Sequence, residues 1–372
     1  MNALPFRPQN RIQFEPPDEF YRVLRQRVAD WLAAEGRTPY GNRETWIKGG
    51  IYMALLMGSY AALLTVNGPL MLSYGFWVLC GLSALFVVYN LSHDAAHGAL
   101  TPWPRFNAWL YVMTFNLLGV SAYLWRLRHV HSHHLFPNLN GCDADIDANP
   151  FVRLSPNHPR RWYMRWQHLY AHLLYPWVNL HSVTWNDWLY LRASQLANMS
   201  QLQHPRREWV IFFGAKALFV VMTLLLPRFA LNLSWLEALG GFVFMNAAIS
   251  LAFIYMNIVN HFSVASAFPE PAAGRVGHSW AAHQLATTVD YYPESRWANW
   301  LTGGFNAHAA HHLFPQICHV HYPGISRIIR QTAFEYGLPY TAVRFGQALR
   351  LHQQLLYRLG REDHPTIPMK PV

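Results

Sequence analysis

Three histidine clusters stand out in this sequence because their spacings match about one turn of a helix. They are His93-Asp94-Ala95-Ala96-His97, His129-Val130-His131-Ser132-His133-His134 and His308-Ala309-Ala310-His311-His312. Residues three and four apart share one face of a helix. Each cluster is therefore predicted to aim two or three imidazoles at one point, as a metal site requires.

The number of histidines bears on the kind of metal site. A further histidine, His261, ends a long apolar stretch, so that nine candidate ligands can be counted: His93, His97, His129, His133, His134, His261, His308, His311 and His312. Nine imidazoles are too many for one tetrahedral zinc ion. They fit two metals of higher coordination number that keep positions open for oxygen. Imidazole binds Fe, Cu, Ni and Zn, so the ligand type leaves the metal open.

The composition indicates a membrane protein. Of 372 residues, 52% are hydrophobic and only 13% are charged, which is unusual for a soluble protein. The net charge of +10 comes without a run of Lys or Arg, so nucleic-acid binding is not expected. The three cysteines, Cys80, Cys142 and Cys318, are scattered, which argues against a disulfide framework or a thiolate metal site.

Four apolar stretches are long enough to cross a bilayer, and they pair into two hairpins. They cover about residues 50–66, 70–90, 209–226 and 236–259. A fifth stretch, 106–125, lies between two histidine clusters and is expected to lie flat at the interface or to re-enter. A full crossing would put the first and second clusters on opposite sides of the membrane. An amphipathic helix is expected over 19–35, and no signal peptide is recognised.

The distribution of positive charge predicts the orientation. Apart from Lys216 and Arg228, all Lys and Arg residues lie on the histidine side of the predicted spans, 27 of 29 in total. The positive-inside rule puts that side in the cytoplasm. Lys216, inside the third span, is expected to snorkel to the interface. We thus expect an all-α integral protein of the inner or plasma membrane, with four transmembrane helices, interfacial helices and a cytoplasmic histidine-rich cap. Its parts are a cytoplasmic segment 1–48, a membrane domain 49–325 and a cytoplasmic segment 326–372.

The three clusters resemble the histidine boxes of membrane fatty acid desaturases, over roughly residues 85 to 325. His133-His134-Leu135-Phe136-Pro137-Asn138, the aspartates that follow it, and Asn299-Trp300-Leu301-Thr302-Gly303-Gly304-Phe305-Asn306 are similar to the front-end, acyl-CoA desaturase-like branch. By position, the resemblance implies that all nine histidines are metal ligands and that Asn257 holds a metal-bound water. His131 has no counterpart, and at His308 this branch usually has glutamine.

The resemblance implies a non-haem di-iron enzyme that uses O2 to desaturate a fatty acyl chain. The acyl group could be carried by CoA, a carrier protein or a lipid. The sequence lacks the His-Pro-Gly-Gly motif of a fused cytochrome b5, so a separate ferredoxin or cytochrome b5-type donor with its reductase is implied. Hydroxylation, acetylenation and ketolation remain alternatives at the same site. A non-enzymatic metal carrier would need an ionisable path through the spans, which offer only Lys216 and Glu237.

Several other residues are candidates for supporting roles. Asp94, Asp145, Asp147 and Asp290 could accept hydrogen bonds from ligand imidazoles, although Asp145 and Asp147 also suit a turn. Trp280, Trp297 and Trp300 could line an acyl tunnel or form an interfacial belt. Arg153, Arg160, Arg161 and Arg165 could bind phosphates or form a solvated loop. Four histidines near the last cluster could support the ligands: His278, His283, His319 and His321. Six others are expected at the surface or interface: His168, His172, His181, His204, His352 and His364.

Overall fold

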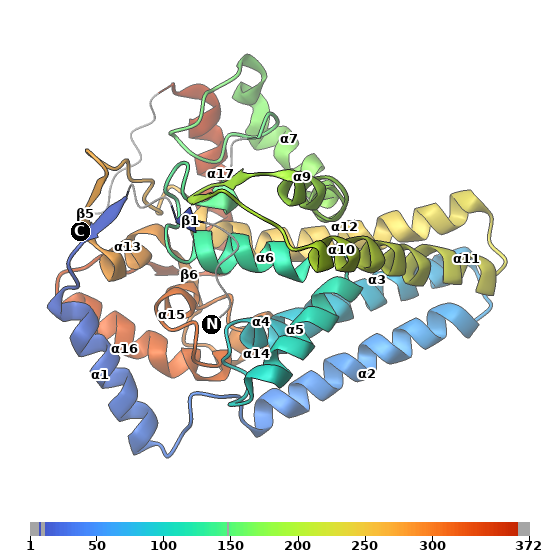
Figure 1. Ribbon diagram of the computed structural model, residues 1–372, viewed down its shortest axis with the longest axis horizontal. Coiled ribbons are helices and arrows are strands. Elements are labelled where there is room, and N and C mark those ends of the chain that lie inside the picture. The colour runs from blue at the N-terminus through green and yellow to red at the C-terminus, as the bar shows by residue number, and fades with distance from the viewer. Residues whose placement is uncertain (1–6, 9–11, 147–148, 364–372) are drawn as a thin grey trace.

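The computed structural model describes residues 7–8, 12–146 and 149–363, and its long helices form two hairpins that project to one side of a helical cap (Figure 1). Within these described residues, four helices are long and apolar enough to cross a membrane, as predicted, or five if the bent pair Pro104–Leu117 and Ala122–His133 is one span. The first hairpin is α2 (Arg43–Thr65) and α3 (Leu70–Val87), which continues through a π-helical turn (Val88–Ser92) into α4 (His93–Ala96). The second is α10 (Arg206–Val220), a π-helical turn (Val221–Leu225), α11 (Leu226–Ala230) and α12 (Trp235–His261).

Two of the hairpin helices, α2 and α12, begin at positions capped by a side chain. The Asn42 side chain accepts the Thr45 N–H, so α2 starts seven residues before the predicted apolar stretch. Ser234 and Glu237 form a capping box at the start of α12. From there α12 runs unbroken to His261, so that the end of this helix carries a candidate ligand.

Close helix packing joins the two hairpins, because α3 contacts both α2 and α12. Glycine makes this approach possible. A Cβ atom at Gly241 would lie 2.3 Å from the Trp77 ring, and one at Gly81 would lie 2.6 Å from Met245. Small residues at helix crossings are typical of membrane bundles.

The apolar stretch between the first two histidine clusters is bent. It consists of α5 (Pro104–Leu117) and α6 (Ala122–Arg128), which continues into a π-helical turn (His129–His133), and the two halves differ in direction by 107°. Gly119, with φ of +76°, lies at the bend. The bend returns the chain so that His129 lies beside His93, with Nε2 atoms 3.3 Å apart.

Lys216 has two polar partners. It forms an ion pair with Asp187 (2.6 Å) and donates to the carbonyl of Gly119, while its snorkelling to a membrane interface stays a prediction. The same Asp187 carboxylate accepts the Ser121 N–H at 3.0 Å. Lys216 turns inward because this ion pair and the bend offer it acceptors within reach. The pair therefore ties α10 to the bend that leads into the second histidine cluster.

The cap is helical and encloses the third histidine cluster (Figure 1). Apolar residues of α1 pack with those of α16 around α15. The helices of this part are α1 (Glu19–Ala34), α13 (Trp280–Thr287), α14 (Arg296–Thr302), α15 (His308–Leu313), a 3-10 turn (His319–His321), α16 (Tyr322–Glu335) and α17 (Phe345–Arg361).

Short elements connect the second cluster to α10. They are 3-10 turns at Ala144–Ile146, Trp162–Trp166 and Tyr175–Trp177, helices α7 (Gln167–Leu174), α8 (Val178–His181) and α9 (Asp187–Arg192), and a π-helical turn at Ser182–Asn186. Strands β1 (Arg7–Pro8), β4 (Met199–Ser200) and β3 (Gln195–Leu196) form an antiparallel sheet in that order. Two parallel pairs join β2 (Gln13–Glu15) to β5 (Arg275–Ser279) and β6 (Asp290–Tyr291) to β7 (Ala342–Val343).

Candidate metal centre

The nine predicted histidines converge in one region, where all except the partly exposed His97 are buried. Eight of them form two groups whose possible ligand atoms lie within 4.8 Å of one another. The first group is His93, His97, His129 and His311, and the second is His133, His261, His308 and His312. Two four-histidine groups are an arrangement that can hold two metal ions.

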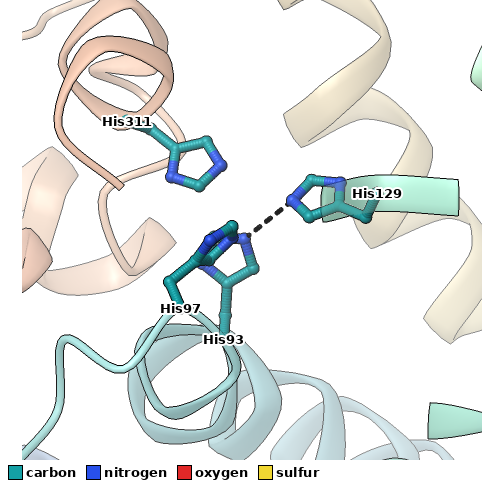
Figure 2. Close-up of side chains that lie close together, drawn as sticks. All are labelled: His93, His97, His129 and His311. Carbon is teal, nitrogen blue, oxygen red and sulfur yellow. Dashed lines mark hydrogen bonds between the residues drawn. The ribbon is translucent and has the colours of Figure 1, made fainter. Parts of the chain in front are cut away.

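Figure 2 shows how the first group is assembled from three segments of the chain. His93 and His97 come from the end of the first hairpin, His129 comes from the end of α6, and His311 reaches in from α15. The four rings face a common point.

His134 lies between the two groups. Its Nε2 is 3.0 Å from the Nε2 of His129 in the first group. Its ring stacks on His312 of the second group at 4.5 Å and meets His311 at the same centroid distance. All nine predicted ligands are therefore placed at the site.

The second cluster departs from simple α-helical geometry. The His134 N–H donates to the His129 carbonyl, a five-residue step, so the turn is π-helical. The wider turn puts the His134 Nε2 beside that of His129, while the His133 ring lies 4.6 Å from His261 in the second group. The expectation that each cluster aims at a single point was wrong for this cluster and for α15, where His311 joins the first group. Single π turns inside helices are frequent at functional sites.

The nitrogen positions fit metal binding. Two imidazole nitrogens bound at right angles to one ion, each about 2.1 Å away, would lie about 3 Å apart. The Nε2 pairs His308 and His261, His261 and His312, and His93 and His129 are 2.8, 3.1 and 3.3 Å apart. Among the described residues, the buried Nε2 atoms of His97 and His311 have no hydrogen-bond partner. Unpaired buried nitrogens that face one another are costly unless a cation lies among them.

Hydrogen bonds at the opposite ring nitrogen orient several ligands. His133 Nδ1–H donates to Asp143 at 3.1 Å, and His312 Nδ1–H donates to the Gln284 side-chain oxygen at 2.8 Å. His261 Nδ1–H donates to the Thr287 carbonyl at 3.0 Å. These bonds place the proton on Nδ1, which leaves the Nε2 lone pair free for a metal.

Burial also keeps the third cluster in its metal-binding protonation state. Burial and the neighbouring histidines hold the pKa values of His308, His311 and His312 well below the ordinary imidazole range. These rings are therefore neutral near pH 7, as metal ligation requires.

The predicted supporting carboxylates act differently from expectation. Asp145 pairs with Arg128 at 2.9 Å and is 3.9 Å from His133, because Asp143 occupies the position next to the ring. Asp290 accepts the Ala309 N–H and the Tyr340 hydroxyl, so it holds the backbone of α15. Asp147 lies outside the described residues.

Asp94 supports the site through another histidine. Its carboxylate accepts from His319 Nδ1–H at 2.6 Å and from the Cys318 thiol at 2.9 Å. Lys48 in turn donates to His319 Nε2 at 2.6 Å. The first cluster is thus tied to the segment that follows the third. His319 was among the four histidines predicted as possible supporting groups, and it contacts Asp94 instead of a ligand.

Within the described residues, the hydrogen bonds of Asn257 and the ring contacts of Trp280 and Trp300 are made to residues other than the nine histidines. The Asn257 amide donates to the Tyr89 hydroxyl and to a helix carbonyl. Trp297 is 82% exposed, which is inconsistent with the lining of a closed tunnel. Trp280 and Trp300 pack on Tyr21 and Tyr52. Other aromatic rings do lie against predicted ligands: Trp125 stacks on His129 at 4.4 Å, and the Phe305 ring lies 4.6 Å from that of His93.

Arg153 and several of the remaining candidate histidines have partners outside the two histidine groups. Arg153 is buried and donates to backbone carbonyls, including those of Leu359 and Glu362, so it is not free to bind phosphate. His283 donates to the Pro137 carbonyl beside the second cluster and contacts His278. His321 bonds to the Tyr40 carbonyl. His352 is buried, contrary to its predicted surface position, because Tyr175 and the Phe262 carbonyl satisfy its ring. His364 lies outside the described residues.

The sequence interpretation missed three partners of the ligands: Asp143, Gln284 and the Thr287 carbonyl. Only Asp143 had a signal, as the first of the aspartates that follow the second cluster. Gln284 and Thr287 lie on α13, which carries no ligand, so only the fold brings them to the histidines.

Comparisons with known proteins point to one family. Residues 69–344 match the family model described as "Fatty acid desaturase". The chain is 32% identical to an acyl-lipid (8-3)-desaturase of Physcomitrium patens, with 92% of this chain and 72% of the relative covered. It is 30% identical to an sn-1 linoleoyl-lipid 6-desaturase of Arthrospira platensis (89% of each chain) and 31% identical to one of Synechocystis (94% and 98%).

Proposed function

This chain belongs to the fatty acid desaturase family, and we propose that its nine clustered histidines hold two iron ions. The protein is an oxidoreductase that introduces a double bond into a fatty acyl chain. The proposal of two ions rests on one observation above all, the division of eight histidines into two groups of four with His134 between them.

Iron at this site would supply the activation of O2. Desaturation removes two hydrogens from adjacent acyl carbons, and O2 takes these with two protons and two electrons to give two waters. The protein's part is to keep the imidazoles of the third cluster neutral, to fix the direction of three ligands through Asp143, Gln284 and Thr287, and to exclude water from the buried histidines.

We further propose a lipid-linked acyl substrate, in preference to one carried by CoA or a carrier protein. The relatives named above are acyl-lipid and linoleoyl-lipid desaturases, and they are matched over most of their length. The electrons would come from a ferredoxin or cytochrome b5-type donor with its reductase. The four apolar helices would cross the inner or plasma membrane, with the histidines on the cytoplasmic face. The catalytic unit would be residues 49–325, flanked by cytoplasmic segments 1–48 and 326–372.

Expression in a host with its own reductase, followed by mass spectrometry of total fatty acids, tests the reaction. The expected product is two mass units lighter than its precursor and is missing in His312→Ala. A product sixteen units heavier would mean hydroxylation instead.

Metal analysis of the purified protein tests the site separately. We expect two irons per chain and a loss of iron in His312→Ala, whereas His181→Ala, at an exposed position, keeps both. One iron or none in the active wild-type enzyme would contradict the proposed centre.

A further inference from the structure

A shallow groove of about 310 Å³ opens between α9 and the start of α10. Its volume lies at the lower end of the range of about 300 to 1,000 Å³ for small-molecule sites. Its lining combines an apolar floor with polar groups: Leu191, Arg192, Ala193, Ser194, Leu202, His204 and Trp209. Such a lining suits a ligand with both a charged and an apolar part.

The polar side of the groove is positive. Arg192 is exposed, and its guanidinium lies 5.4 Å from the Trp188 ring, a contact that leaves its edge N–H groups available. Arg206 and Arg207 follow His204 closely and are also exposed. The neighbouring acidic residue, Glu208, forms an ion pair with Arg207 at 2.8 Å. Arginine at such a position favours phosphate or sulfate groups, because its planar fork can make two hydrogen bonds to their oxygens.

The groove lies where lipid headgroups are expected. It opens at the first turn of α10, a helix apolar enough to cross the membrane, with α9 beside it (Figure 1). Exposed Trp177 and Trp185 precede α9, and Trp188 meets Trp209 edge to face. Tryptophan gathers at headgroup depth, and basic pockets between membrane helices on the cytoplasmic side bind anionic headgroups.

One helix joins the groove to the metal centre. The Tyr123 hydroxyl, near the start of α6, donates to His204 Nδ1 at 2.9 Å. Six residues later the same helix reaches the ligand His129, a rise of about 9 Å along a helix axis. A headgroup in the groove would therefore lie within an acyl chain's length of the histidines.

We propose that this groove binds the anionic headgroup of the glycerolipid whose acyl chain is desaturated, with Arg192 as its main contact. This inference rests on the proposed function and names the carrier at the same site. It assigns the choice of lipid headgroup to residues outside the histidine clusters.

The test uses the full chain in nanodiscs of phosphatidylcholine with added phosphatidylglycerol, whose retention per chain is counted by native mass spectrometry. Wild type should retain phosphatidylglycerol in preference to phosphatidylcholine. A basic residue near the surface contributes about 1 kcal/mol to anionic lipid binding, so Arg192→Gln should weaken retention roughly fivefold. Arg192→Lys should keep part of the preference, and Arg228→Gln, at the other end of the same membrane span, should keep all of it.

Steady-state kinetics then test whether the bound lipid is the substrate. Arg192→Gln should raise the KM for phosphatidylglycerol-linked acyl chains roughly fivefold with kcat unchanged. Equal retention of both lipids by wild type, an Arg192→Gln protein with unaltered preference, or an unchanged KM would each overturn the inference. Lipid retention by inactive His312→Ala separates the two proposals. If this variant prefers phosphatidylglycerol but the wild type does not desaturate any acyl chain, only the proposed reaction is contradicted and the headgroup site stands.

Discussion

The buried Asp94 carboxylate accepts a hydrogen bond from His319 Nδ1–H at 2.6 Å, which joins the first histidine cluster to the segment after the third. Lys48, in the first long helix, donates to the other nitrogen of the same ring. Three segments far apart in sequence are therefore held together at Asp94, the residue next to His93. Asp94 and His319 act as positioning residues and belong to neither four-histidine group.

Asp94→Asn should reduce iron content and turnover by up to about tenfold, the lower end of the range for direct partners of metal ligands, because Asp94 is next to His93 in the chain but bonds to His319. The amide cannot match the carboxylate as an acceptor for both the His319 ring and the Cys318 thiol, so His93 loses its support. Iron per chain and product formation measure the effect. Asp30→Asn, at an exposed position on α1, is the matched control. Full iron occupancy in Asp94→Asn would refute the positioning role.

Gly303→Ala should disturb the packing of the segment before the third histidine cluster against the backbone of Tyr89. Gly303 has φ of +63°, and a Cβ atom there would lie 2.3 Å from the Tyr89 carbonyl oxygen. Gly98→Ala is a close control, because Gly98 has φ of +73° but open space around its Cβ position. Gly98→Ala should lower the free energy of unfolding by about 1 to 2 kcal/mol, from backbone strain alone. Gly303→Ala should cost clearly more and lower iron content, and equal thermal stability of the two variants would argue against a steric role.

Lys216→Met should destabilise the protein by about 3 kcal/mol, because it leaves the Asp187 charge buried without its partner. The bend before the second cluster should loosen at the same time, since Lys216 also holds the Gly119 carbonyl. Thermal unfolding in detergent measures the loss. Arg228→Met removes a cation from the other end of the same span and should change little. The double variant Lys216→Met with Asp187→Asn should recover part of the stability, and a further additive loss would exclude coupling of the pair.

Acid should destabilise the cap through His352. Burial lowers the pKa of His352 to about 4, from an ordinary value of 6.5. Because the unfolded chain takes up the proton first, the stability that neutral His352 provides is complete above pH 6.5 and is lost between pH 6.5 and 4. The loss should reach about 3 kcal/mol. Unfolding temperatures of wild type and His352→Gln across this window should converge at low pH, whereas exposed His181→Gln should follow wild type throughout. Parallel curves for wild type and His352→Gln would contradict this assignment.

The sequence alone predicted the nine histidines that converge at the candidate site and the helices that carry them. Histidine spacing and the length of apolar runs are local properties, so the nine imidazoles and the four long helices could be predicted, whereas the 107° bend between the first two clusters appears only in the structure. The assignment to desaturases could be made from the same motifs, because a metal site requires specific side chains at specific spacings.

Only the tertiary structure decided how the histidines are shared and what orients them. The π-helical turn at His129–His133 sets the division of the second cluster, and no local pattern distinguishes it from an α-helix. Asp143 and Gln284 orient ligands from separate segments, and Asp187 meets Lys216 from another helix. These contacts depend on how the helices pack, because a buried polar group takes whichever partner the fold brings within reach. Spacing along the chain therefore fixed the chemistry of the site, and long-range packing fixed its geometry.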